Sequence, residues 1–344
     1  MLFQTYYRLD PWGFEPPLHA FTPTHFDLRD EKFSLYMRYK GAYSEHEEPQ
    51  ILIHTVHRHD DIPDNVKRIF SGDTGADLGL RASRPDGLGN FPECYRQFAL
   101  KLHSHMDEMA TNLFNVIRWH RGIMGGPLVL QSEWSSMRWH DPTKGEQILD
   151  VHGFLNRQMP AGVFLLELPE MQFASLNRER CEAVEELFRS KARQPLYHDL
   201  LREACQNKKT NSRSALVMGI AAAETGFKIT ATDLNPSTSW ILENLPSPPL
   251  DRMIREYLEQ LPARRTFDGK VRRPPNTMIS TLKKGIELRN KLVHGREENV
   301  DPKQLNEILI AVRDLLYLLD FYRGHDWALD RLTPEVAEEM RKGT

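Results

Sequence analysis

Between residues 176 and 324 the apolar side chains recur every three or four positions, which is the period of an amphipathic helix. Helices are predicted to begin at Asn177, at Pro195 and at Asn211 or Ser212, because these residues favour helix starts. Further helices are predicted at about 252–261, from 276 to 294, and from 302 to a stop at Gly324. Five or six helices with short connections predict an all-α bundle.

The first 170 residues have a different pattern. Short β-branched or aromatic runs at 33–39, 50–56, 128–134 and 163–168 are separated by Pro, Gly, Asp or charged residues, which favours strands joined by loops. One helix is predicted from about Phe98 to Gly122, and a long loop at 71–92. The expected fold class is therefore α+β, with a mixed α+β sensing or regulatory domain at 1–170. A helical domain at 171–330 and a C-terminal tail at 331–344 follow.

The composition is that of a globular protein: 344 residues, 45 basic and 48 acidic, with a formal charge of −3. This excludes collagen-like, disordered and disulfide-scaffold classes. No apolar run approaches the ~20 residues needed to cross a bilayer, and the first residues lack the pattern of a secretory signal. Three cysteines without a CxxC pair are typical of a reducing compartment. We therefore expect a cytoplasmic protein with no membrane partner.

The charge is unevenly distributed. Residues 262–296 hold ten basic and two acidic side chains, so the rest of the chain is strongly acidic. A local positive field attracts polyanions, and Lys and Arg contacts to phosphate are the main source of nonspecific nucleic-acid affinity. The alternative is a solvated loop followed by an exposed helix face. As RNA-binding candidates we name Arg272, Arg273, Lys283, Lys284, Lys291 and Arg296.

The segment Ile286-Glu-Leu-Arg-Asn-Lys-Leu-Val-His-Gly295 lies inside this basic stretch. An arginine, Arg289, is followed directly by the polar Asn290 and, five positions after the arginine, by His294 at a predicted helix end. This resembles the R-x4-6-H motif of the HEPN superfamily (higher eukaryotes and prokaryotes nucleotide-binding domains). The resemblance spans about residues 180–325 and includes the small-residue helix at 212–224 that ends in Glu224. The arrangement is most similar to the Apea-like branch.

The resemblance implies a metal-independent endoribonuclease with an active site shared by two subunits, and a role in antiviral defence or as a toxin. Arg289, Asn290 and His294 would be catalytic, and Glu224 would hold Arg289. The implied partners are RNA, a second copy of the chain or a larger even oligomer, and an activating ligand or protein at the N-terminal domain; no cofactor is expected. The alternative is a catalytically silent HEPN module that dimerises or binds nucleotides.

The chemistry of these residue types suits the reaction. Cleaving RNA without a metal needs a base for the 2′-hydroxyl proton, an acid for the 5′-oxygen and cations for the charge on phosphorus. Histidine can serve as either acid or base near neutral pH, and arginine carries a permanent charge and a planar fork. One chain supplies one such histidine, so a two-fold dimer would supply both proton-transfer groups. Apolar Leu282, Ile286 and Val293 on the same helix suggest the dimer surface.

Helix geometry leaves the arginine–histidine pair open. Five residues on an ideal helix advance ~500°, so Arg289 and His294 are ~140° apart and converge only if the helix changes near Gly295. The alternative is a surface arginine with a histidine at the negative end of the helix dipole. For Glu224 the alternative is an exposed carboxylate at a helix edge.

Two other groups of residues are candidate sites. His54, His57 and His59 do not share one face of an extended strand, so we expect no metal site there. Tryptophans such as Trp119, beside Arg118 and Arg121, could stack on bases, but core positions are favoured for them.

Overall fold

A computed structural model provides the structure of the chain. It describes residues 2–9, 24–28, 33–40, 50–58, 62–70, 93–122, 124, 131–132, 138–140, 148–150, 183–184, 186–188, 190–244, 249–296 and 299–342. The chain divides into two compact units. Unit 1 comprises Met1–Ile117 and Leu128–Arg193, and unit 2 comprises Arg118–Pro127 and Gln194–Thr344. The expected boundary near residue 170 lies outside the described residues.

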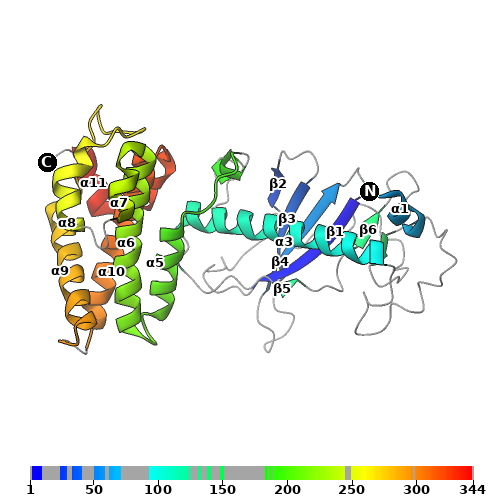
Figure 1. Cartoon of the computed structure of the whole chain (residues 1–344), viewed down its shortest axis with the longest axis horizontal. Coiled ribbons are helices and arrows are strands. Elements are labelled where there is room, and N and C mark those ends of the chain that lie inside the picture. The colour runs from blue at the N-terminus through cyan, green and yellow to red at the C-terminus, as the bar shows by residue number, and fades with distance from the viewer. Residues whose placement is uncertain are drawn as a thin grey trace. The chain divides into compact units, whose positions relative to one another are not determined.

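Backbone pairing in unit 1 joins seven strands in the order β2-β3-β4-β1-β6-β7, and β5 also pairs with β1 (Figure 1). All the pairs are antiparallel. The strands are β1 (Leu2–Leu9), β2 (Thr24–Leu28), β3 (Phe33–Lys40), β4 (Gln50–Arg58), β5 (Gln131–Ser132), β6 (Arg138–His140) and β7 (Ile148–Asp150). This part also contains the helices α1 (Asp64–Phe70) and α3 (Glu93–Arg121), and the last four residues of α3 belong to unit 2.

Two of the predicted strand segments are confirmed as β3 and β4, which pair from Phe33 with His57 to Lys40 with Gln50. Of the segment 128–134 only β5 is a strand, and 163–168 lies outside the described residues. The strand β1 was not predicted, although it pairs with β4, β5 and β6.

The predicted α+β fold class is wrong for the part of the chain in which the structure describes side chains as well as the backbone. In that part 77% of the residues are helical, with almost no strand and no sheet. The helix α3 also extends beyond its predicted bounds: it has 29 residues and begins before Phe98. Residues 334–342, predicted to lie in a tail, form a helix as well. This part is therefore an all-helical structure rather than an N-terminal mixed α+β domain.

Unit 2 is built from helices that follow the predicted periodicity. The long ones are α5 (Leu196–Asn207), α6 (Ser212–Leu234), α9 (Asn276–Val293) and α10 (Pro302–Tyr322). The shorter ones are η3 (Pro236–Thr238), α7 (Ser239–Asn244), α8 (Leu250–Arg252), η4 (Met253–Tyr257), η5 (Leu258–Gln260), η6 (Asp326–Arg331) and α11 (Pro334–Lys342). Asn211 caps α6 by accepting from the Ser214 N–H, and Asp301 caps α10 by accepting from the Gln304 N–H, as predicted.

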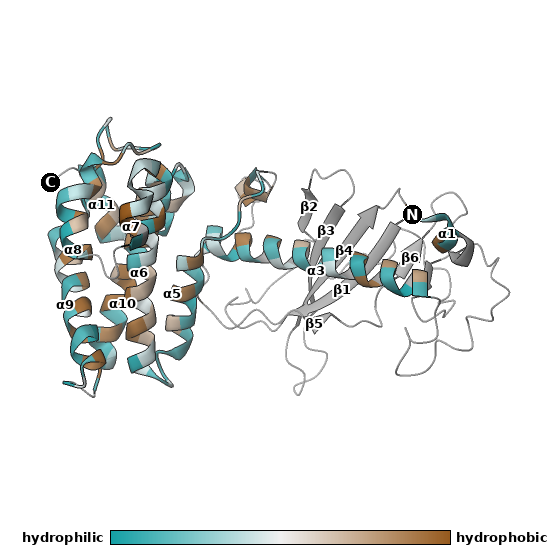
Figure 2. Ribbon diagram, viewed as in Figure 1, coloured by the Kyte–Doolittle hydropathy of each residue, from teal (hydrophilic) through white to brown (hydrophobic). Residues whose placement is uncertain are grey.

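The core of unit 2 lies along α6 and α10, where hydrophobic residues concentrate in Figure 2. The apolar residues that recur at helical spacing are buried on both helices: Leu216, Ile220, Ala223 and Phe227 form the stripe of α6, and Leu305, Ile308, Val312, Leu315, Leu319 and Tyr322 form the apolar face of α10. Small residues let these helices approach closely, since a Cβ added at Gly226 would lie 2.4 Å from a methyl carbon of Leu316. Among the described helices, none combines the length and the apolar content needed to cross a membrane.

A buried carboxylate joins three helices of unit 2. Asp320 on α10 accepts hydrogen bonds from the Trp119 indole N–H at 2.8 Å and from the Tyr197 hydroxyl, and its Oδ2 lies 2.6 Å from Nε2 of His198. Arg323 donates to the Tyr197 hydroxyl at 2.8 Å and lies 3.9 Å from Asp320. Trp119 is 2% exposed, so it is a core residue and cannot stack on a base. This is the core position that the sequence favours for it.

Candidate functional site

The helix α9 carries the arginine–histidine motif and ends where the sequence predicts. The His294 and Gly295 N–H groups donate to the carbonyls of Asn290 and Leu292, and the Arg296 N–H donates to that of Lys291. Gly295 has φ +67°, the left-handed conformation that glycine adopts readily. These are the bonds of a Schellman C-cap, so His294 is the last residue before the chain turns away.

Close packing places the motif against α6. A Cβ added at Gly285 would lie 2.9 Å from side-chain carbons of both Ile220 on α6 and Ile308 on α10. Glycine at this position therefore permits α9 to approach both neighbours closely. One turn further along α9, Arg289 faces α6 and reaches Glu224.

Arg289 and Glu224 form an ion pair between α9 and α6. The Nη2 of Arg289 donates to Oε1 of Glu224, and the two side chains are 18% and 17% exposed. The Nε of Arg289 is buried without a hydrogen-bond partner among the described residues. The contact expected between these residues is thus present, and Glu224 is not the exposed helix-edge carboxylate of the alternative. A guanidinium has five N–H donors, so this pairing leaves others for a phosphate.

His294 is exposed at the end of α9, and Asn290 is exposed one turn before it. Neither side chain makes a hydrogen bond or ion pair among the described residues. Arg289 is directed to Glu224, and no hydrogen bond joins Arg289 and His294 in the described part of the chain. The ~140° separation on an ideal helix accounts for this. The structure therefore brings Arg289 to Glu224 and leaves His294 exposed at the surface.

Ion pairs hold the loop that precedes α9. Its arginines pair with acidic side chains: Arg264 with Asp233 at 2.9 Å, Arg265 with Asp326 at 2.7 Å, Arg272 with Asp268 at 2.8 Å and Arg273 with Glu259 at 4.0 Å. Arg272 also donates to the carbonyls of Met340 and Arg341 at the end of α11. Much of the basic charge of this loop is therefore used in holding unit 2 together.

The basic side chains on α9 and at its C-terminal end make fewer ion pairs than those of the loop. Lys283 lies 3.9 Å from Glu287, an exposed pair that contributes little. Lys284, Lys291 and Arg296 are exposed and make no hydrogen bond or ion pair among the described residues. The 18 residues of α9 span about 27 Å at ~1.5 Å per residue. Arg272 and Arg273 therefore lie at the opposite end of α9 from His294, and the predicted RNA-binding residues do not form one patch.

A cavity of about 720 Å³ lies between the start of α6 and the end of α9. It is lined by Arg213, Ser214, Val217, Met218, Leu292, Val293 and Gly295. The residues directly before and after His294 in the sequence are therefore both part of its lining. Val217 and Val293 are 37% and 63% exposed. Sequence reasoning missed this feature. The available signal was Val217, an apolar residue that does not belong to the buried stripe of α6.

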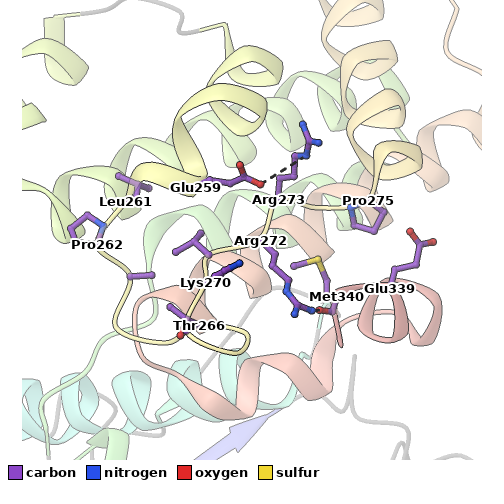
Figure 3. Close-up of a pocket in the computed structure, with 13 residues that line it drawn as sticks. Glu259, Leu261, Pro262, Thr266, Lys270, Arg272, Arg273, Pro275, Glu339 and Met340 are labelled. Atoms are coloured by element: carbon purple, nitrogen blue, oxygen red, sulfur yellow. Dashed lines mark hydrogen bonds and ion pairs between the residues drawn. The ribbon is translucent and has the colours of Figure 1, made fainter. Parts of the chain in front are cut away.

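A second cavity, of about 760 Å³, lies at the other end of α9 (Figure 3). Lys270, Arg272 and Arg273 from the loop line it together with Glu259 and with residues of α11. Figure 3 shows Arg273 directed to Glu259. Because charges of both signs meet there and two of the cations already have carboxylate partners, this cavity does not select for an anion.

No group of three or more His, Cys, Asp or Glu side chains that could hold a metal ion occurs in the described part of the chain. His54 and His57 lie on β4 three positions apart, so they belong to opposite faces of the strand. His59 lies outside the described residues. Comparison with models of known protein families, with curated proteins and with solved structures found no match.

Proposed function

We propose that this protein is an endoribonuclease that cleaves RNA by attack of the 2′-hydroxyl, with His294 as acid or base and Arg289 as the cation for phosphate. The observation that carries the proposal is the C-cap of α9, which exposes His294 beside Lys291 and Arg296. An exposed histidine can exchange a proton with RNA. The two neighbouring cations, which have no acidic partner among the described residues, attract the RNA backbone.

Arg289 would act from a held position. Glu224 fixes one edge of its guanidinium, so less conformational freedom is lost when a phosphate binds the remaining N–H groups. Asn290, exposed one turn before His294, would offer an amide to the same substrate. Arg289 and His294 of one chain share no hydrogen bond among the described residues, so the two groups would act together through a substrate or a second copy.

The second copy is part of the proposal for a chemical reason. Cleavage requires one group to take a proton and another to give one, and each chain offers one His294. The exposed apolar surface is smaller than expected for the dimer interface. Leu282 is buried, Ile286 is half-buried, and only Val293 of the three is well exposed. A role in defence or as a toxin rests on the HEPN resemblance alone.

The alternative is a silent module in which the Arg289–Glu224 pair only joins two helices. The mostly buried ion pair, with no hydrogen bond from Arg289 to His294 among the described residues, favours this alternative. Comparing wild type with His294→Ala separates the two. The endoribonuclease should lose about 10²- to 10⁴-fold in cleavage rate, as expected when an acid or base is removed. The matched control is His105→Ala, an exposed histidine on α3. Equal RNA breakdown by His294→Ala and wild type would refute the nuclease.

A mixing experiment tests the shared site. When wild type and His294→Ala are combined in equal amounts and allowed to exchange, random pairing leaves about a quarter of the dimers with two wild-type chains. If both histidines are needed, activity should fall to about that quarter rather than to a half. A strict monomer in sedimentation at micromolar concentration, with full activity, would contradict the dimer.

A further inference from the structure

The cavity between α6 and α9 has the form of a small-molecule site beside His294. Its volume of about 720 Å³ lies within the ~300 to 1,000 Å³ usual for ligand pockets. Four of its lining residues are apolar, namely Val217, Met218, Leu292 and Val293, and the polar side chains among the lining are Arg213 and Ser214. A lining of apolar side chains with one arginine and one serine fits a flat, partly apolar ring better than it fits an ion.

The charge around the cavity selects an anionic ligand. Arg213 is exposed and makes no hydrogen bond or ion pair among the described residues. Among the described residues that line the cavity, none has an acidic side chain. Lys291 and Arg296 flank the lining residues Leu292, Val293 and Gly295 in the chain, and both are exposed. These exposed cations attract a polyanion, which would neutralise their charge.

A nucleotide of single-stranded RNA combines the required features. Its base has an apolar face that can cover the exposed Val293 and Val217, and its phosphate can accept from Arg213. In a duplex the base faces are covered by stacking, so only an unpaired base can enter. A base held here would place the adjoining phosphate near the chain segment that carries His294.

We infer that this cavity binds one unpaired nucleobase of the RNA substrate, with Val217 and Val293 against the base and Arg213 on a phosphate. The inference rests on the proposed function and deepens it, because it restricts the substrate to single-stranded RNA and assigns a binding role to Arg213.

Binding is measured in the His294→Ala background, so that RNA stays intact. Short fluorescent RNAs of one sequence are used in three forms: single-stranded, duplex, and a series of single strands with one abasic nucleotide at each position in turn. The protein variants add Arg213→Ala or Val293→Ser. The matched control is Arg255→Ala, an exposed arginine one turn before Glu259 of the other cavity. Affinity is recorded as a function of salt concentration.

Arg213→Ala should weaken binding about three- to tenfold near 0.1 M salt and lower the salt slope by about 0.7, the value for one phosphate contact on a single strand. Val293→Ser should weaken binding about two- to fivefold without changing the slope. One abasic position should cost about fivefold or more. Duplex RNA should bind more weakly than the single strand, and Arg255→Ala should bind like the parent.

The inference is overturned if both cavity variants bind single strands like the parent, if every abasic RNA binds equally, or if the variants change the sedimentation of the protein instead of its affinity for RNA. The last result would mean that a second copy covers the cavity. Failure of the proposed function has a different signature: His294→Ala then degrades RNA as fast as wild type, whatever the cavity variants do to binding.

Discussion

Replacement of Asp320 by asparagine should destabilise unit 2 strongly. The carboxylate is 0% exposed and meets three groups on two other helices: the Trp119 indole, the Tyr197 hydroxyl and His198. Asparagine has a similar shape but offers one oxygen and an NH₂ group, so at least one of these donors loses its acceptor, and Arg323 loses a nearby negative charge at 3.9 Å. Removing one partner of a buried ionic pair costs ~3 to 5 kcal/mol.

Urea unfolding followed by circular dichroism measures this loss. With an m value of ~2 kcal/mol/M, the midpoint should fall by about 1.5 to 2.5 M. The control is Asp330→Asn, an exposed aspartate with no ion pair or hydrogen bond among the described residues, which should change stability by no more than ~0.5 kcal/mol. Hydrogen exchange should locate the loss in α5, α10 and the last turn of α3.

The pH dependence gives a second test of the same residue. Burial alone would raise the pKa of Asp320, but the charge of His198 and the hydrogen bonds from His198, Tyr197 and Trp119 outweigh it and lower the pKa below the usual value. A carboxylate with a lowered folded-state pKa stabilises the fold above its unfolded pKa of ~3.9 and loses this effect as the pH falls through the folded value. The difference between wild type and Asp320→Asn should therefore shrink only below about pH 4. A loss under ~1 kcal/mol at pH 7 would refute the reasoning.

Three further predictions concern the site. A double-mutant cycle with Arg289→Gln and Glu224→Gln should give a coupling free energy of ~1 to 2 kcal/mol in urea unfolding. If the pair positions Arg289 for phosphate, Glu224→Gln should also slow cleavage. An unchanged cleavage rate would mean that the pair contributes to stability alone. Lys291→Ala should reduce the salt slope of RNA binding by about 0.7, whereas Arg272→Ala should instead lower the stability of unit 2 by ~1 to 2 kcal/mol, because Arg272 holds carbonyls at the end of α11. Cleavage should continue in chelator and leave a 2′,3′-cyclic phosphate or 3′-phosphate with a 5′-hydroxyl, while DNA stays intact; full dependence on added magnesium or manganese would contradict the mechanism.

The local features of unit 2 could be predicted from the amino-acid sequence. The caps Asn211 and Asp301, the stop at Gly295 and the buried faces of α6 and α10 follow from interactions within one or two helical turns, and sequence spacing records these directly. The position of His294 at a helix end belongs to the same class of prediction. The predicted contact between Arg289 and Glu224 came from a family resemblance, because the 65 positions between them place it beyond any local rule.

Which residues share a surface depends on how the helices pack, and the sequence does not show this. The basic residues of 262–296 are continuous in sequence, but a helix of about 27 Å separates their two ends, and carboxylates from distant segments such as Asp233 and Asp326 pair with the cations of the loop. The burial of Leu282 and the cavity beside Val293 depend on how closely α9 packs on α6 and α10. The distance between α9 and these two helices depends on the small size of Gly285 and on the side chains that Gly285 meets on α6 and α10. Those side chains belong to other helices, so the sequence pattern of α9 does not show them.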